Sequence, residues 1–547
     1  MAGGSLLFIL SAGAPPVSPE ARILQRRPVI TMSADKIETF DVVVVGGGGA
    51  GLAAAAEAAR LGRRVVLLEK NPALGGSTAW SVGSISITNS PHQLKCGIRD
   101  TPQEHFEDLG LLAGAHAPRD NLELRRVLAD NTNDIFEWLH GLGLEFAGPM
   151  MEPPHRYPRM HLVLPNSRAF PHHLGRHCRR LGVDIRLNTR VEQLLVEDGR
   201  VKGVQAAAAT GSRAEFIARG GVVLAAGDYS AGRELKARFA GESVAALDAV
   251  NVTATGDGHR MALEIGALVV NGDIVRGPIM RFVPPSHDRW ILKLPPWRWL
   301  ARSMRLALEH LPQAWLRPFA MSFLTTALGP SPELFRNGAI LVNRNGERFA
   351  DELAGPARAV PRQPDQVTYI VFDHKLAQRF TAWPHYVSTA PGIAYAYLAD
   401  YRRNRADIYH EAATVEGLAR SMGVSAAALS RTFNDYNGAG RATRPALDAA
   451  PFYALGPVKS YVVFTDGGLK VTERLEVTRE DGAAIAGLYA AGSTGQGGLL
   501  LEGHGHHLGW AFISGRIAGR SAAYAVPPIN SKDLATESNG NSRKMCR

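Results

Sequence analysis

Two short runs of consecutive apolar residues near the start of the chain predict buried strands joined by a helix. Residues 42–45 are four valines in a row, and residues 65–68 are also all apolar. The alanine-rich stretch between them, from about residue 51 to 61, predicts a helix. A strand, a helix and a second strand in this order predict a βαβ unit, whose two strands lie parallel in one sheet.

The turn between the first strand and the helix carries a glycine motif. Gly46, Gly48 and Gly51 have the G-x-G-x-x-G spacing, and Glu69 ends the second strand, roughly 20 residues further on as this fingerprint requires. Such glycines let the backbone approach a pyrophosphate, the helix N-terminus offers it N–H groups, and the acid binds ribose hydroxyls. The sequence therefore predicts dinucleotide binding, although this motif alone does not separate FAD from NAD.

The chain beyond this unit alternates between helical and strand patterns up to about residue 271. Helices are predicted at 101–112 and 122–142, and strands at 183–195, 200–208 and 220–229. The last of these strands ends in a turn of small residues, like the first strand of the chain. We expect the two turns to lie close together, near the nucleotide.

A change of character after residue 275 predicts an inserted domain. Pro and Trp are dense at its start, and helices are predicted at 414–422 and 426–436. Glycine-rich, strand-rich sequence returns from residue 461, and a helix is predicted at 508–524. Cofactor-like turns on both sides of an unlike stretch indicate one domain inserted into another.

The predicted fold class is α/β: a Rossmann-like nucleotide-binding domain in two segments with an inserted α+β capping domain. The apolar run at residues 6–10 is too short to span a membrane and lacks the preceding basic residues of a signal peptide, so residues 1–37 predict a disordered extension. The stretch after residue 526 is rich in Pro, Ser and Asn and predicts a disordered tail. The predicted parts are a disordered extension (1–37), the first nucleotide-binding segment (38–275), the capping domain (276–445), the second segment (446–525) and a disordered tail (526–547).

Composition and charge narrow the class of protein further. Three widely spaced cysteines, Cys96, Cys178 and Cys546, fit no disulfide or metal pattern and favour a reducing, cytoplasmic location. The net charge of +10 is partly local, because residues 276–317 hold eight Lys/Arg against two acids. No nucleic-acid-binding motif accompanies this charge, so a nucleic-acid partner is not expected.

Part of this basic segment, residues 290–317, is also rich in tryptophan and has an apolar stripe at helical spacing. Two interpretations remain open. A helix of this kind can lie on an anionic membrane surface, which would place the protein peripherally at the inner membrane. Alternatively, its apolar face covers the cofactor cleft as a lid, and either interpretation suits an apolar substrate.

Five motifs together resemble the fumarate reductase/3-oxosteroid dehydrogenase superfamily of FAD flavoproteins. They are the glycine motif, Glu69-Lys70 followed by Gly75-Gly-Ser-Thr-Ala-Trp-Ser81, Val222-Val-Leu-Ala-Ala-Gly227, Thr255-Gly-Asp-Gly258 and Gly487-Leu-Tyr-Ala-Ala-Gly492. The resemblance covers about residues 38–525. It implies FAD as the cofactor, bound non-covalently, because Ser77-Thr78 stands near the position where the covalent form has a histidine.

The resemblance also implies which residues contact FAD. Those expected to do so are Gly46, Gly48, Gly49, Ala50, Gly51, Glu69, Lys70, Gly76, Ser77, Thr78, Ala226, Gly227, Asp257, Gly492 and Leu508. In this assignment the first glycines face the pyrophosphate and Glu69 faces the adenosine ribose. The turn from Gly505 to Leu508 lies near the flavin ring, where a helix dipole stabilises the anionic reduced flavin.

The chain departs from the soluble fumarate reductases where those enzymes bind their substrate. Pro356 aligns with their proton-donating arginine, and Arg358, two residues on, is a candidate substitute. Phe464 aligns with a carboxylate-binding histidine, and His507 with a carboxylate-binding arginine. A dicarboxylate requires paired cations, so fumarate is not the expected substrate.

The candidates for acid–base chemistry are His504, His506 and His507, in a glycine-rich turn at a helix start. The helix dipole lowers a histidine's pKa there, and a neutral histidine can act as a base or a hydrogen-bond donor. Equally, one or two of them could only hold the flavin or cap the helix. Tyr395, in the predicted capping domain, is a further candidate. No metal site is expected, because a flexible glycine turn offers no fixed ligand geometry.

We therefore interpret the chain as an FAD-dependent oxidoreductase that dehydrogenates or reduces a carbon–carbon bond, with hydride passing to flavin N5. The expected substrate is a hydrophobic alicyclic molecule such as a 3-oxosteroid-like ketone or a terpenoid. The expected acceptor is not NAD, since no second dinucleotide motif is present. Three alternatives remain: a dicarboxylate reductase, allylic hydroxylation through a flavin-generated cation, and a flavin subunit working with a partner subunit.

Overall fold

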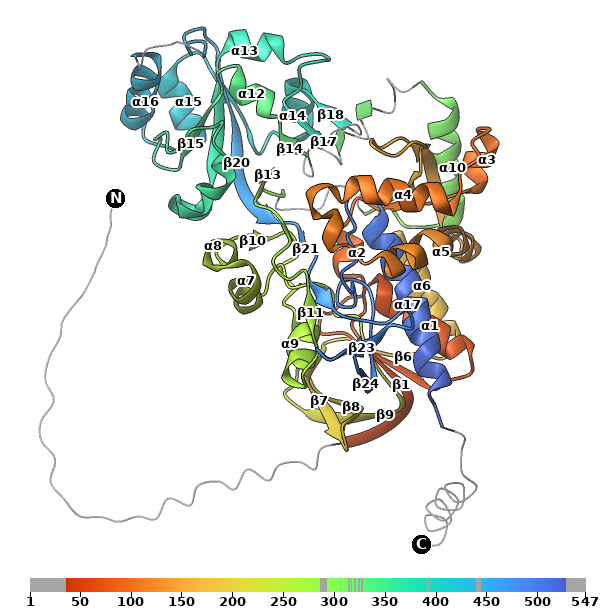
Figure 1. The fold of residues 1–547 in the computed structure, drawn as a ribbon. Coiled ribbons are helices and arrows are strands. Elements are labelled where there is room, and N and C mark those ends of the chain that lie inside the picture. The colour runs from red at the N-terminus through yellow and green to blue at the C-terminus, as the bar shows by residue number, and fades with distance from the viewer. Residues whose placement is uncertain are drawn as a thin grey trace, which may run out of the picture. The chain divides into compact units, whose positions relative to one another are not determined.

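The structure is a computed structural model that describes most of the chain from Lys36 onward (Figure 1). The described residues are 36–285, 293–312, 315, 317, 318, 321, 322, 325, 328–390, 394–438 and 444–527. The predicted disordered extension (1–37) and tail (526–547) therefore lie almost wholly outside the described residues. All described residues belong to one unit, Lys36–Arg547.

The predicted βαβ unit forms the centre of the largest sheet. β1 (Lys36–Val45) pairs in parallel with β2 (Val65–Leu68), and α1 (Gly49–Arg60) connects them. On its other side β1 pairs in parallel with β9 (Arg213–Leu224), and β24 (Ala484–Ala490) pairs in parallel with β9. In Figure 1 the red β1 and the blue β24 therefore belong to one sheet, so both ends of the chain build this domain, as predicted.

One predicted strand of this sheet is two strands in the structure. Residues 183–195 divide into β6 (Asp184–Arg186), which pairs in parallel with β2, and β7 (Thr189–Glu197), which forms a hairpin with β8 (Arg200–Ala208). The break falls at Asn188, whose φ of 53° is left-handed. Asn adopts this conformation more readily than most residues, so the turn is encoded locally, although the apolar pattern runs through it.

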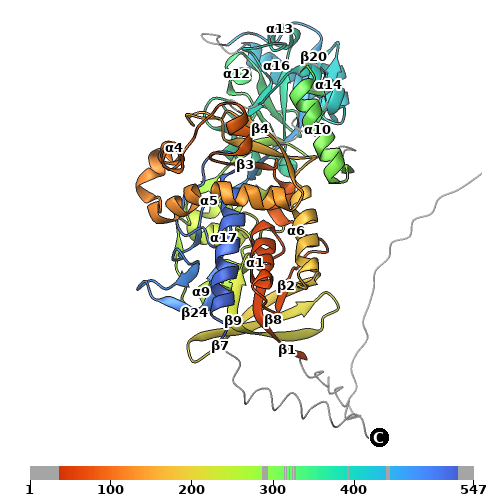
Figure 2. The ribbon, with the colours of Figure 1, turned by 90° about the vertical axis from the view of Figure 1, so that its right-hand side faces the viewer.

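Helices from the two ends of the chain pack directly on each other (Figure 2). α17 (His506–Tyr524) lies alongside α1, and α6 (Ala169–Arg180) packs on α1 as well. The α1 and α17 backbones touch, because a Cβ at Gly515 would lie 2.3 Å from the carbonyl oxygen of Ala50. This contact fixes the start of α1 against the middle of α17.

Further elements surround the N-terminal end of α17. α5 (Leu122–Gly141) packs on α17, and α4 (Pro102–Leu112) packs on α5. A small antiparallel sheet of β3 (Ser84–Ser86), β5 (Met160–Leu164) and β4 (Glu145–Met150) contacts α17 through β3. These elements supply the residues that contact the glycine-rich turn with His504, His506 and His507, called the histidine turn below.

A second sheet is built around β20 (Phe452–Val462). β16 (Thr368–Phe372) pairs antiparallel with it and with β15 (Ile340–Asn343), while β13 (Ile279–Phe282) and β19 (Tyr409–Ala412) also pair with β20. The sequence assigns β20 to the second nucleotide-binding segment, but the strand is the centre of this other sheet.

The remaining elements are short or lie at the edges of the two sheets. The helices are α2 (Gly76–Trp80), α3 (Pro91–Lys95), α7 (Arg233–Ala240), α8 (Glu242–Ala245), α9 (Asp257–Glu264), α10 (Arg298–His310), α12 (Pro332–Arg336), α13 (His374–Arg379), α14 (Leu398–Asn404), α15 (Val415–Met422) and α16 (Ala426–Gly438). The strands are β10 (Asp248–Ala249), β11 (Val269–Val270), β12 (Val275–Arg276), β14 (Gly329–Pro330), β17 (Ser388–Ala390), β18 (Ala394–Ala396), β21 (Phe464–Thr465), β22 (Gly468–Leu469) and β23 (Glu476–Thr478). Within the described part of the chain, no helix combines the length and the apolar character needed to span a membrane.

Candidate active site

A cavity lies where β1, β9 and β24 end, at the edge to which parallel α/β sheets bind their ligands. It contains about 840 Å³ of empty space, part of it continuous with solvent, and residues from both ends of the chain line it. Of the residues predicted to contact FAD, all line this cavity except Gly51 and Leu508. The structure thus brings the predicted cofactor residues together in one place.

The glycine motif shows why Gly51 is absent from the lining. A Cβ on Gly51 would lie 1.9 Å from the carbonyl oxygen of Gly46, so Gly51 allows α1 to pack against the end of β1. Gly48 is different, since the nearest protein atom to its Cβ would be Gly75 O at 3.8 Å. The backbone at Gly48 is therefore open to the cavity at the N-terminus of α1, as a bound pyrophosphate requires.

Leu508, the other residue that does not line the cavity, is buried in the main hydrophobic core. It lies in the first turn of α17, and Ala511, one turn further along, does line the cavity. The first turn of α1 and the second turn of α17 therefore both reach the nucleotide site, whereas Leu508 contributes to packing.

Two charged residues beside the cavity are held in place by hydrogen bonds. The Glu69 carboxylate accepts from the backbone N–H of Gly47 at 2.6 Å and of Asn71 at 2.8 Å. Lys70 Nζ donates to Asp257 Oδ2 at 2.9 Å. The Asn71 side chain donates to Glu69 as well, at 2.7 Å. A carboxylate has about four lone-pair sites, so Glu69 keeps one with which to accept a ribose hydroxyl. These residues fit an adenosine ribose.

The second half of the cavity is braced by hydroxyl groups. Thr78 Oγ1 accepts the N–H of Gly49 at 3.1 Å, and Ser77 Oγ accepts from Asn251 Nδ2 at 2.9 Å. On the other side Ser514 Oγ accepts the N–H of Gly492 at 2.9 Å. The bonds at Thr78 and Gly492 fix the backbone at the starts of α2 and α1 and at the end of β24.

The histidine turn does not act as one group, because its three histidines enter three different environments. His504 Nδ1 lies 2.6 Å from Glu152 Oε1, and the His504 backbone N–H donates to the same carboxylate at 2.9 Å. Burial raises the pKa of Glu152, but its hydrogen bonds from His504 outweigh this effect and leave the pKa below its ordinary value. Glu152 therefore holds His504 and the turn.

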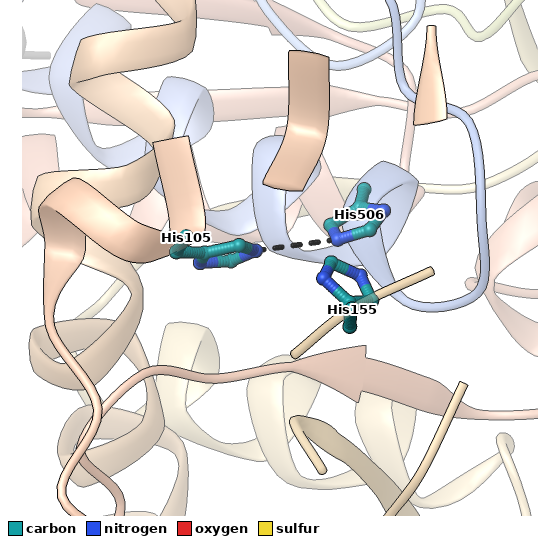
Figure 3. Close-up of side chains that lie close together, drawn as sticks. All are labelled: His105, His155 and His506. Atoms are coloured by element: carbon teal, nitrogen blue, oxygen red, sulfur yellow. Dashed lines mark hydrogen bonds between the residues drawn. The ribbon is translucent and has the colours of Figure 1, made fainter. Parts of the chain in front are cut away.

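His506 points into a buried group of three histidines (Figure 3). Its Nε2 lies 3.3 Å from Nε2 of His105, and the ring of His155 is 5.2 Å from that of His506 between centroids. Burial lowers the pKa of all three histidines, that of His155 to about 4. The group is neutral near pH 7, and His506 anchors the start of α17.

These three histidines have ring nitrogens within 4.8 Å of one another, close enough to hold a metal ion. The hydrogen bonds argue against one. Arg159 donates to His155 Nδ1 at 2.8 Å, so the proton of the neutral His155 ring is on Nε2, the other nitrogen. His155 then offers no free lone pair, and the buried guanidinium of Arg159 repels a cation. The predicted lack of a metal site stays a prediction.

His507 faces the position that the sequence singled out at Phe464. The two ring centroids are 4.1 Å apart, although the residues come from β21 and α17. Burial lowers the pKa of His507 to about 4, an effect to which Arg276 adds and which Asp466 opposes. Within the described residues, His507 Nε2 is buried and makes no hydrogen bond.

A charged group that the sequence did not reveal surrounds this pair. The Arg276 guanidinium contacts the carboxylates of Asp466, at 2.9 Å, and Glu502. Asp466 is fully buried, accepts from Gln496 Nε2 at 2.9 Å and lies 4.0 Å from His507 Nε2. We refer to Arg276, Phe464, Asp466, Glu502 and His507 as the polar cluster.

Long-range strand pairing explains why the sequence did not predict Arg276. β12 pairs antiparallel with β21, so that Arg276 lies opposite Phe464. Nothing near Arg276 in the sequence marks it as functional. The sequence could have indicated Asp466 and Glu502, because both lie within a few residues of the positions already singled out, Phe464 and His504.

Tyr395 and Arg358, the other catalytic candidates, lie in different surroundings. The ring of Tyr395 packs against those of Tyr386 and Trp383, with centroids 4.7 and 4.9 Å apart. Arg358 is an exposed residue of a 3-10 turn, Pro356–Arg358. The structure does not bring either residue into the polar cluster, and their catalytic roles stay predictions.

The fold and the cavity together define a dinucleotide-binding α/β protein. The chain matches the family described as FAD binding domain over residues 41–287 and 308–500, which is most of its length. The protein belongs to this family and is an FAD-dependent oxidoreductase, which confirms the predicted cofactor, the α/β fold and the family resemblance.

Known proteins similar to this chain point to the same class. The probable fumarate reductase Ifc3 of Shewanella frigidimarina is 28% identical over 90% of this chain and 76% of its own length. The vinyl phenol reductase of Lactiplantibacillus plantarum is 27% identical over 90% of this chain and 98% of its own.

Among solved structures, the open conformation of a flavocytochrome c3 fumarate reductase superposes with a TM-score of 0.67 at 27% identity, covering 90% of this chain and 79% of that one. A 3-ketosteroid-delta4-(5alpha)-dehydrogenase from Rhodococcus jostii has a TM-score of 0.56 at 24% identity, covering 90% and 99%. These similarities establish the fold, and the substrate follows from neither.

Proposed function

We propose that this flavoprotein dehydrogenates or reduces a carbon–carbon bond of a hydrophobic, ring-bearing substrate such as a 3-oxosteroid-like ketone or a terpenoid. The same proposal excludes dicarboxylates as good substrates. Bound FAD supplies the hydride acceptor or donor at its N5. The polar cluster would surround the reacting part of the substrate, because Phe464 and His507 align with residues that bind substrate in the soluble fumarate reductases.

The charge balance of the polar cluster carries this proposal. Its one guanidinium, on Arg276, is already paired with the two carboxylates of Asp466 and Glu502. With His507 neutral, the cluster has one negative charge in excess. A dicarboxylate would meet no free cation there and would be repelled, whereas a neutral molecule would not.

The Phe464–His507 contact supports an apolar substrate. The phenyl ring of Phe464 and the neutral imidazole of His507 are in contact and tilted by 55° to each other, and the imidazole has one polar atom without a hydrogen bond, Nε2. Such a site binds a ring by stacking and directs one hydrogen bond at a carbonyl or hydroxyl group. Vinyl phenol, after which one relative is named, is a ring compound without a carboxylate.

The proposal assigns proton transfer to His507, with Asp466 as the group that orients or charges it. His507 is neutral near pH 7, because its pKa is lowered to about 4, and either tautomer leaves one ring nitrogen able to take a proton. Asp466, 4.0 Å away, would stabilise the imidazolium that forms. His504 and His506 would serve as anchors of the turn.

We further propose that the electron acceptor is not NAD and that the protein is cytoplasmic, as expected from the sequence. The sequence contains one G-x-G-x-x-G fingerprint, Gly46 to Gly51, and no second one for a nicotinamide dinucleotide. Substrate-dependent bleaching of the flavin in the purified single chain, followed by turnover with an artificial dye, would show that no partner subunit is needed for the chemistry.

Half-reactions of the purified, FAD-loaded chain test the substrate. The flavin is reduced anaerobically and mixed separately with fumarate, an unsaturated 3-oxosteroid and a cyclic monoterpenoid enone. Reoxidation is followed by flavin absorbance and the products by mass spectrometry. We expect a ring enone to reoxidise the flavin and fumarate not to do so. Fast reoxidation of the flavin by fumarate would overturn the proposal. So would a failure of every ring enone to reoxidise the reduced flavin together with a failure of the matching saturated ketones to bleach the oxidised flavin.

A further inference from the structure

Helix α10 lies on the surface and is held by a narrow inner face. Ala301 is 2% exposed and packs with Ala147 of β4 and Leu164 of β5, and Met304 packs against the same group. No residue of α10 lines the cavity. The described helix is therefore anchored on the small sheet, which does not favour the interpretation of this segment as a lid over the cofactor.

The rest of α10 and its flanking residues expose large apolar side chains. Between 42% and 64% of each is accessible to solvent in the five residues Trp297, Trp299, Leu306, Leu308 and Leu311. The two tryptophan rings stack with centroids 5.7 Å apart. At about 100° per residue, Trp299 and Leu306 point away from the buried Ala301, whereas Leu308 and Leu311 lie on the side of Ala301 and Met304. Isolated exposed apolar residues need no explanation, but the stacked tryptophans together with Leu306 form an exposed apolar group, which marks an interaction surface.

Basic residues lie among these apolar ones. Residues 293–311 contain four Lys/Arg and one acid, Glu309, which is paired with Arg305 at 2.6 Å. Arg305 and Arg298 also lie 3.3 and 3.6 Å from the carboxylate of Glu145 on β4, so Arg302 and Lys293 are the basic residues of this stretch that carry the surface charge. Arg302 is exposed and falls between Trp299 and Leu306 at helical spacing, on the same outer face. Protein interfaces concentrate apolar side chains at the centre and charges at the rim. On α10 the charged Arg302 lies among the exposed apolar side chains. This arrangement suits a lipid surface, where an arginine reaches phosphate while its aliphatic stem stays among apolar groups.

We propose that the outer face of α10, with Trp297, Trp299 and Arg302 as its main contacts, docks the protein on an anionic lipid bilayer. The tryptophans would insert at the headgroup level, and the basic side chains would bind lipid phosphates. The helix lies in the interface plane and does not cross it. This inference does not depend on which substrate the flavin site uses.

Flotation of the full, FAD-loaded chain with lipid vesicles tests the docking surface. One set of vesicles contains phosphatidylglycerol with phosphatidylcholine, and the other phosphatidylcholine alone. We expect the chain to float with the anionic vesicles only and to be released by salt. The double variant Trp297→Ala/Trp299→Ala should bind at least about tenfold more weakly, and Arg302→Gln about fivefold more weakly.

The control is Trp383→Ala, which removes an equally exposed tryptophan, 64% accessible, from another part of the chain. It should float like the unchanged protein, and unchanged flavin absorbance would show that every variant is folded. The inference is overturned if the chain floats with neither vesicle, if it binds both equally, or if Trp383→Ala reduces binding as much as the double variant. It is also overturned if sedimentation shows a dimer that the double variant abolishes, because a second copy would then cover α10.

Discussion

The ring of Phe464 rests against the imidazole of His507, with 4.1 Å between the two centroids. These residues are the ones that align with a carboxylate-binding histidine and a carboxylate-binding arginine in the soluble fumarate reductases. The structure brings them into contact and adds Arg276, already neutralised by two carboxylates. Both substitutions and the charge around them therefore lie at one place, and this is the basis of the proposal that the substrate is neutral and less polar.

Replacing this pair by the cationic residues of those relatives should shift substrate choice. The double variant Phe464→His/His507→Arg would restore two groups able to bind carboxylates. We expect fumarate-dependent reoxidation of the reduced flavin to rise about tenfold or more and ring-enone turnover to fall, as measured by stopped-flow absorbance. Phe464→Tyr, which keeps the aromatic ring, is the control and should show no gain in fumarate-dependent reoxidation of the flavin. A double variant that binds FAD normally and gains nothing with fumarate would count against the assigned site.

Two glycines of one motif should respond differently to alanine. In Gly51→Ala the new Cβ would lie 1.9 Å from Gly46 O, so the helix must shift and the fold should lose about 1–3 kcal/mol of stability or more. In Gly48→Ala the nearest protein atom is 3.8 Å away, so the FAD-free chain should keep its Tm while FAD affinity falls. Thermal unfolding with and without FAD, together with flavin titration, separates the two effects. Equal Tm losses in both FAD-free variants would contradict the structure.

Buried histidines should make the protein sensitive to acid. Burial lowers the pKa of His155 to about 4, below its ordinary value near 6.5 in the unfolded chain. Between these values the unfolded state binds more protons than the folded state, so stability is lost as pH falls from about 6.5 to 4. The full effect of such a shift is about 3 kcal/mol for one histidine.

The variant His155→Gln tests this acid sensitivity, since glutamine can still accept from Arg159 but does not titrate. The slope of Tm against pH between pH 6.5 and 4 should be shallower than in the unchanged protein. His116→Gln, at an exposed position, is the matched control and should keep the slope. Identical slopes in all three proteins would mean that His155 is charged in the folded state.

Removing Arg276 should alter both stability and the pH dependence of activity. Arg276→Leu leaves the buried Asp466 without its cation, which costs about 3–5 kcal/mol of stability. Because the charge of Arg276 lowers the pKa of His507, its loss should raise that pKa and move the acidic limb of the rate profile to higher pH. Arg276→Lys keeps the charge and should restore most of the profile. A lower Tm with an unmoved profile would mean that Arg276 is structural only.

Chelators should leave the protein unchanged. Arg159 donates to His155 Nδ1 at 2.8 Å, so the three-histidine group offers no complete set of lone pairs for a metal ion. We expect dialysis against EDTA to alter neither Tm nor flavin turnover, and elemental analysis to find no stoichiometric zinc, copper or nickel. A drop in Tm that zinc reverses would show that the histidines rearrange around an ion.

The sequence predicted the nucleotide-binding half of the protein well, because its signals are local. The valine run, the glycines and Glu69 lie within one βαβ unit, and their spacing reflects backbone geometry and helix packing. The break at Asn188 was missed, since the apolar pattern continues through it and one left-handed residue redirects the strand. The split of the three histidines was also beyond the sequence, because adjacent residues on a helix start point in different directions.

The substrate site was harder to predict, because it depends on contacts between distant segments. Arg276 reaches Phe464 only through the pairing of β12 with β21, and no local motif encodes that pairing. The sequence showed that Phe464 and His507 differ from the aligned residues of the soluble fumarate reductases. It did not show that the charged groups of the polar cluster surround them. Tyr395 drew attention by its residue type and its place in the predicted capping domain, and its ring packs in an aromatic group.

The contact of α17 with α1 has a consequence for biosynthesis. The cavity is lined by Gly46 near one end of the chain and by Gly492 and Ala511 near the other. A ribosome delivers the first of these long before the last, and domains fold as their parts emerge. A nascent chain that stops short of β24 has only half of the nucleotide cradle. FAD can therefore be bound only after β24 and α17 have been made, and until then the glycine turn and the apolar face of α1 lack their native partners.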